Sequence, residues 1–190
     1  MSILLAFISF TSADKWRFDL DLSMILNAIF IFIIIGFAEE IIFRGWLWGE
    51  LQQSFSYKTS FYLQALIFSL AHIRFDYDFL HLCTLLFGLF LLGLLLGLRR
   101  ILDNGSILGS IGLHGGLVGI WFIFEKGFIE FSPDSSPLIV GPGLYSPNPI
   151  GSLLSIFIML LVLFNYRREF VRYLRVSDDT VNDSSRGANP

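Results

Sequence analysis

The sequence predicts an all-α protein, a polytopic transmembrane helix bundle with five to six spanning helices. Hydrophobic residues make up 54% of the 190 residues and charged residues only 15%, whereas soluble domains average about 45–50% and about 25%. The apolar residues form long runs that are nearly free of charge, which is typical of helices surrounded by lipid. Two of these runs end at arginine pairs, as expected where helices leave the bilayer on the cytoplasmic side.

The apolar runs divide the chain into an N-terminal segment (1–21), a membrane domain (22–166) and a polar tail (167–190) that we expect to be disordered. The run at 3–10 is too short to cross about 30 Å of hydrocarbon, so it is either an interfacial segment or a helix cut short by the start codon. In the membrane domain, helices are predicted at 22–51, 61–72, 79–98, 107–124 and 150–165. Between the last two, a stretch with five of the six prolines predicts a loop outside the bilayer.

The arginines predict the orientation. Basic residues beside spanning helices favour the cytoplasmic side, and here they are Arg99, Arg100, Arg167, Arg168, Arg172 and Arg175. This arrangement requires the last two helices to cross outward and back, with the proline-rich loop outside. It predicts an integral, multi-pass membrane protein with a cytoplasmic C-terminus, and it brings residues 39–50 near the cytoplasmic face.

The strongest chemical signal is a pair of glutamates followed by an arginine inside the first long helix. A charge at this depth costs about 2.5–3.5 kcal/mol on insertion scales. Glu40 and Arg44 stand four residues apart, so they can pair on one helix face, which leaves Glu39 free to titrate or to bind water. Alternatively, the helix ends near Ala38 and the charges lie at the interface, but the apolar pattern continues to Trp46.

Two histidines stand in later helices. His72 closes its helix, with Phe68 one turn before it; a lone histidine there is usually interfacial. His114 continues a stripe with Ser106 and Ser110 among glycines that let helices approach closely. Because polar residues in a bilayer rarely face lipid, we expect the stripe to face the bundle interior. The alternative is that it only holds helices together by hydrogen bonds.

Together these segments predict a site with two carboxylates, two imidazoles and one guanidinium. Glu39, His72 and His114 could bind Zn²⁺ with an open position for water. A metal-free site would use a carboxylate as the base for water, with imidazoles stabilising an oxyanion. Either chemistry hydrolyses an amide. The single cysteine, Cys83, excludes a disulfide within the chain, and no serine or cysteine stands beside a base as an obvious nucleophile.

The order Glu39-Glu40-x-x-x-Arg44, Phe68-x-x-x-His72 and a later His114 resembles the three motifs of the CPBP intramembrane proteases. That family includes the type II CAAX prenyl proteases and the bacterial Abi proteins, and the resemblance covers about residues 35–121.

The resemblance implies an endopeptidase, CAAX prenyl protease-like, that hydrolyses membrane-associated protein substrates, including prenylated CAAX-type proteins. It implies that Glu39 activates water and that Arg44 holds Glu40. His72 would bind the water or a metal, and His114 would stabilise the oxyanion or complete the metal site.

The chain departs from the family pattern at Val118, where the third motif has Asn or Asp four residues after its histidine. One missing oxyanion donor costs about 10²–10³ in rate, and Ser110 is the alternative donor. A weak or inactive scaffold, or an immunity-type peptide-binding protein, is therefore a second hypothesis. A proton-coupled transporter fits less well because the halves show no internal repeat. The predicted partners are lipid and a peptide or protein substrate; the few basic residues disfavour nucleic acid, and the oligomeric state stays open.

Overall fold

The structure is a computed structural model that describes residues 13–132, 134–143 and 146–173, and it is mainly helical. In chain order the elements are β1 (Ala13–Trp16), α2 (Leu22–Glu40), η1 (Ile41–Leu47), α3 (Trp48–Ser54), α4 (Tyr57–Leu70), α5 (Phe79–Leu102), α6 (Leu108–Ile123), η2 (Phe124–Phe128), β2 (Ile129–Phe131), α7 (Pro137–Val140), η3 (Pro149–Gly151) and α8 (Leu153–Asn165). This confirms the predicted all-α helix bundle. The apolar segment 3–10 and the end of the polar tail lie outside the described residues.

Three helical stretches in the described part of the chain are long and apolar enough to cross a membrane: Leu22–Ser54, Phe79–Leu102 and Leu108–Phe128. The other two predicted helices are shorter, with 14 residues in α4 and 13 in α8. At a rise of about 1.5 Å per residue, such helices cover roughly 20 Å, less than a bilayer core. Both pack against the long helix α5.

The first long helix does not end at Ala38. It begins at Leu22, after the N-cap Asp21, whose side chain accepts a hydrogen bond from the backbone N–H of Met24. It then runs through Glu40 into the π-helix η1 and on into α3. The alternative that Glu39 and Glu40 follow the end of the helix is therefore wrong.

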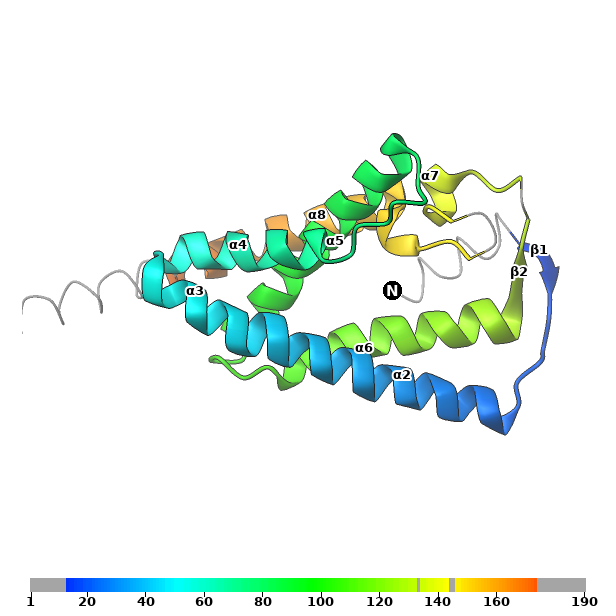
Figure 1. Ribbon diagram of the computed structural model, residues 1–190, viewed down its shortest axis with the longest axis horizontal. Coiled ribbons are helices and arrows are strands. Elements are labelled where there is room, and N and C mark those ends of the chain that lie inside the picture. The colour runs from blue at the N-terminus through cyan, green and yellow to red at the C-terminus, as the bar shows by residue number, and fades with distance from the viewer. Residues whose placement is uncertain (1–12, 133, 144–145, 174–190) are drawn as a thin grey trace, which may run out of the picture.

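The bundle has two layers (Figure 1). The first is the pair α2 and α6, and the second contains α4, α5 and α8. The layers approach each other near α3 and diverge toward β1 and β2, which pair as an antiparallel two-stranded sheet. This sheet ties the segment before α2 to the segment after α6, and the sequence did not predict it. The short, charged β1 carries little of the apolar alternation that predicts a strand.

Small residues let the helices of each layer come close. A Cβ added at Gly36 would lie 2.8 Å from the Cα of Gly115, and one added at Gly115 would lie 2.4 Å from the carbonyl oxygen of Phe32. In the second layer, a Cβ at Gly93 would lie 2.9 Å from the Cα of Ala65. Close backbone contact of this kind is how helices pack within membranes.

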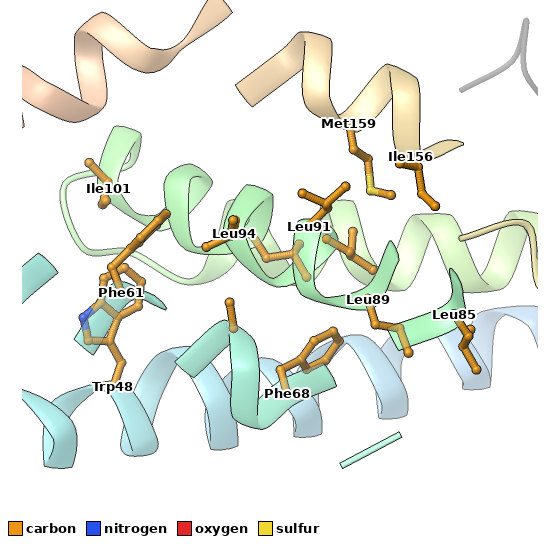
Figure 2. Close-up of a cluster of buried hydrophobic side chains, with 13 residues drawn as sticks. Trp48, Phe61, Phe68, Leu85, Leu89, Leu91, Leu94, Ile101, Ile156 and Met159 are labelled. Carbon is orange, nitrogen blue, oxygen red and sulfur yellow. The ribbon is translucent and has the colours of Figure 1, made fainter. Parts of the chain in front are cut away.

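The apolar core lies around α5 (Figure 2). Phe68 from α4 and Met159 from α8 approach α5 from opposite sides, and Trp48 and Phe61 close one end of the cluster. The first residues of the predicted polar tail join this cluster, since 167–173 is helical and the ring of Phe170 lies 4.5 Å from that of Phe61. At this point the structure differs from the expected disordered tail.

Candidate active site

Glu40 and Arg44 form a fully buried ion pair. The Arg44 Nη1 donates to Glu40 Oε1 at 2.9 Å, and both side chains are 0% exposed. Arg44 Nη2 also donates to the backbone carbonyl of Gly93 at 3.3 Å, so the guanidinium links α5 to the first long helix. The i,i+4 spacing predicted this pair. Because an unpaired buried charge is costly, removing one partner of such a pair destabilises a protein by about 3–5 kcal/mol.

The same carboxylate oxygen of Glu40 positions His114. The Nδ1 of His114 lies 2.9 Å from Glu40 Oε1, and His114 is buried. An ionised carboxylate only accepts hydrogen bonds, so Nδ1 carries the proton and the neutral ring presents an unprotonated Nε2. In this neutral form His114 accepts at Nε2, and it donates there only when the ring is protonated.

His72 has the same tautomer, fixed by a different acceptor. It lies in the turn just beyond α4, and its Nδ1 is 2.8 Å from the carbonyl oxygen of Phe68. Because a carbonyl only accepts, Nδ1 again carries the proton and Nε2 is unprotonated in the neutral ring. That Nε2 faces Glu39.

Glu39 completes the group. Its Oε2 lies 3.5 Å from Nε2 of His72 and 3.9 Å from Nε2 of His114. This oxygen is buried and has no hydrogen-bond partner among the described residues. A carboxylate oxygen and two imidazole lone pairs therefore converge. A water placed between these acceptors has two O–H groups, so it can donate to Glu39 and to one of the two imidazoles.

The three side chains also have the chemistry of zinc ligands. Zinc accepts histidine nitrogen and carboxylate oxygen, and both imidazoles have Nδ1 partners of the kind that orient metal-binding histidines. However, the described residues contain no group of three or more His, Cys, Asp or Glu side chains arranged to hold a metal ion. We therefore derive no step through a metal.

The converging atoms open onto a cavity of about 410 Å³ between the two layers. Its wall includes Glu39, His72, His114 and Val118, so the position that departs from the family pattern does face this space. Sequence reasoning missed the rest of the wall, which includes Tyr77, Trp121, Glu125, Ser146 and Asn148. No motif pointed to these residues. Asn148, which stands between Pro147 and Pro149, offered a polar amide in the proline-rich loop as its only signal.

The polar stripe on α6 is only partly as expected. Ser110 and His114 are buried, but Ser106 is exposed because it precedes the first turn of the helix. The Ser110 hydroxyl donates to the carbonyl oxygen of Leu96 at 2.9 Å. It therefore links α6 to α5, and it does not line the cavity of Glu39.

The site lies within a region that matches a known protein family. The model of the family described as type II CAAX prenyl endopeptidase Rce1-like matches residues 21–120, just over half of the chain. Comparisons with curated proteins and with solved structures gave no match. The matched region contains Glu39, His72 and His114 and ends before the proline-rich loop. The match confirms the resemblance stated from the motifs, and together with the long apolar helices it indicates an integral membrane protein. The chain belongs to the Rce1-like family of type II CAAX prenyl endopeptidases, a family of intramembrane proteases.

Proposed function

We propose that this protein is an intramembrane endopeptidase in which Glu39 activates a water molecule to cleave a peptide bond of a membrane-associated substrate. The observation that carries the proposal is the convergence of Glu39 Oε2 with the Nε2 atoms of His72 and His114, at 3.5 and 3.9 Å. A carboxylate within reach of a water that a neighbouring imidazole nitrogen orients is suited to general-base catalysis.

In this mechanism each side chain has one task. Glu39 takes a proton from the water. At the same time the water oxygen attacks the peptide carbonyl carbon, and the C=O electron pair moves onto the carbonyl oxygen. When the tetrahedral intermediate collapses, the C–N bond breaks and the protonated Glu39 returns the proton to the leaving amine. The second O–H of the water donates to the Nε2 atom of His72 or His114, which orients the water. Glu40 holds His114 and is itself held by Arg44.

We infer that the substrate carries a lipid chain, because an apolar groove adjoins the cavity. The groove, of about 280 Å³, lies between α5, α6 and α8. It shares Leu92, Leu117, Ile150 and Ser155 with the cavity wall. A prenyl group in this groove would hold the attached peptide beside Glu39, in keeping with the family description. A prenylated peptide should then have a lower KM than the same peptide without the lipid, and equal KM values would contradict this inference.

Hydrolysis in water enriched in ¹⁸O tests the proposed reaction. Purified protein in lipid vesicles should release a product whose new carboxylate contains one solvent oxygen, as mass spectrometry can detect. If Glu39 acts directly on water, cleavage should also persist in the presence of zinc chelators. Cleavage that is lost on chelation and restored by zinc would contradict the metal-free mechanism. The absence of any cleaved product would favour the scaffold hypothesis.

A further inference from the structure

The proposed reaction needs a hydrogen-bond donor that ionised Glu39 and the neutral rings of His72 and His114 do not supply. In their neutral forms both imidazoles use Nδ1–H for the structural contacts to Phe68 and Glu40. Their Nε2 atoms and the Glu39 carboxylate are all acceptors. The oxygen of a tetrahedral intermediate is negatively charged, so it requires a donor. With both rings neutral, a donor elsewhere on the cavity wall would meet this need.

We propose that the side-chain amide of Asn148 donates this hydrogen bond from the proline-rich loop. Asn148 lines the same cavity as Glu39, His72 and His114. Its Oδ1 accepts from the backbone N–H of Ile150 at 3.1 Å. Because the carbonyl end of the amide is used in this way, the orientation of the side chain is fixed and the two N–H groups of Nδ2 are left to donate.

Other polar groups on the wall are less suited to this role. The Tyr77 hydroxyl donates toward the carbonyl oxygen of Pro142 at 3.4 Å, and Arg74 makes two hydrogen bonds to Asp76 at 3.1 Å. Trp121 stands seven residues after His114 on the same helix. At about 1.5 Å per residue, this places the two residues about 10 Å apart along the helix axis. Val118 is closer along α6 but has no polar group.

The backbone around Asn148 is held in place on both sides. Its N–H donates to the carbonyl oxygen of Pro142 at 2.8 Å. Gly141, at φ +97°, lies so close to the Asn148 carbonyl that an added Cβ would be 1.8 Å from that oxygen. On α5, a Cβ at Gly88 would lie 2.0 Å from the carbonyl oxygen of Ile150. The loop is thus docked on α5 by direct backbone contact, and a fixed donor is what oxyanion stabilisation requires.

The inference rests on the proposed function and adds one group to it. As the water oxygen bonds to the carbonyl carbon, the carbonyl oxygen gains the electron pair, and Asn148 Nδ2–H hydrogen-bonds to it. The bond persists until the C–N bond breaks and the C=O bond is restored. Asn148 lies outside the matched residues 21–120, so this donor would come from a part of the chain that the family match does not reach.

Asn148→Asp tests the role directly. The substitution keeps an oxygen to accept from Ile150 N–H but removes the amide donor. We expect kcat for a prenylated peptide to fall by about 10²–10³-fold, the usual effect of losing one oxyanion donor, with KM little changed. Ser146→Ala, in the same loop and on the same cavity wall, is the matched control and should leave kcat unchanged. An unchanged kcat in Asn148→Asp, or a loss confined to KM, would overturn the inference.

A rescue experiment covers the case in which Asn148→Asp folds poorly. Asn148→Ala removes the amide without adding charge, and Val118→Asn should restore part of kcat in this background by supplying an amide one turn from His114. A folded double variant with no recovery would overturn the inference. Glu39→Gln separates this test from the proposed function. If Glu39→Gln is inactive while Asn148→Asp cleaves like the wild type, only the role of Asn148 is wrong; if Glu39→Gln cleaves normally, the proposed function is wrong as well.

Discussion

The guanidinium of Arg44 lies over the ring of Phe68, with its Cζ atom 4.3 Å from the ring centroid. The same ring is 4.7 Å from the His72 ring and 5.7 Å from the His114 ring. Phe68 is fully buried, so one aromatic side chain of α4 packs against three of the polar groups of the site. The face of an aromatic ring attracts a cation, with an energy of about 2 kcal/mol or more when the pair is desolvated.

Phe68→Leu should therefore weaken the site while keeping the core apolar. The leucine removes the ring that contacts Arg44 and the two imidazoles, so both the thermal midpoint and kcat should fall. Phe87→Leu, at an exposed position of α5, is the control and should change neither. Normal kcat in Phe68→Leu would show that the ring does not position the histidines.

Arg44→Ala should destabilise the folded protein. The substitution leaves the Glu40 carboxylate buried without its charge partner, which costs about 3–5 kcal/mol. The control is Arg99→Ala, because Arg99 forms an i,i+4 pair with Asp103 near the surface. Such exposed pairs contribute only about 0.2–1 kcal/mol. The two variants are compared by their folded yield and by thermal unfolding in detergent. Equal losses of stability in both variants would contradict the structural role of the buried pair.

Gly115→Ala should separate α2 from α6. The added Cβ would lie 2.4 Å from the backbone oxygen of Phe32, which cannot move aside without shifting a helix, and overpacking of this kind costs about 1–3 kcal/mol. Because the shift moves Glu39 relative to His114, cleavage should fall as well. Gly112→Ala is the control on the same helix, since nothing lies within 4 Å of its added Cβ. A Gly115→Ala variant as stable and active as Gly112→Ala would rule out this tight contact.

Ser110→Ala should affect stability more than catalysis. Its hydroxyl donates to the carbonyl oxygen of Leu96, so the loss should be about 1 kcal/mol, as for a typical hydrogen bond, with kcat unchanged. Thermal unfolding and peptide cleavage measure the two effects. A fall of 100-fold in kcat would instead identify Ser110 as the oxyanion donor that the sequence suggested.

The sequence predicted those parts of the site that depend on spacing along one helix. The i,i+4 rule paired Glu40 with Arg44, and the same geometry left Glu39 on a different face. It could not predict that His114 binds Glu40, because that contact joins residues 74 positions apart and depends on how closely glycines let α2 and α6 approach. Nor could it predict that the hydroxyl of Ser110 bonds to α5.

The parts of the fold that the sequence missed share one physical feature, because they gain their stability from tertiary contacts. The β1–β2 pair is short, and its strands come from distant parts of the chain. The helical start of the tail is held by packing of Phe170 on Phe61, which no local pattern reveals. Asn148 reaches the cavity because Gly88 and Gly141 let the loop backbone dock. The prolines and glycines of the loop do not by themselves predict this contact.

The most direct test of the central claim compares Glu39→Gln with Glu50→Gln in cleavage of a prenylated peptide by protein in lipid vesicles. Both residues lie in the same long helical stretch, but Glu50 is exposed and has no place in the proposed mechanism. Glutamine is nearly isosteric with glutamate and cannot accept a proton from water at neutral pH. The account predicts that kcat falls by at least about 10²-fold in Glu39→Gln, as for the loss of a general base, and stays at the wild-type value in Glu50→Gln. A Glu39→Gln variant that folds and cleaves at the wild-type rate would contradict it.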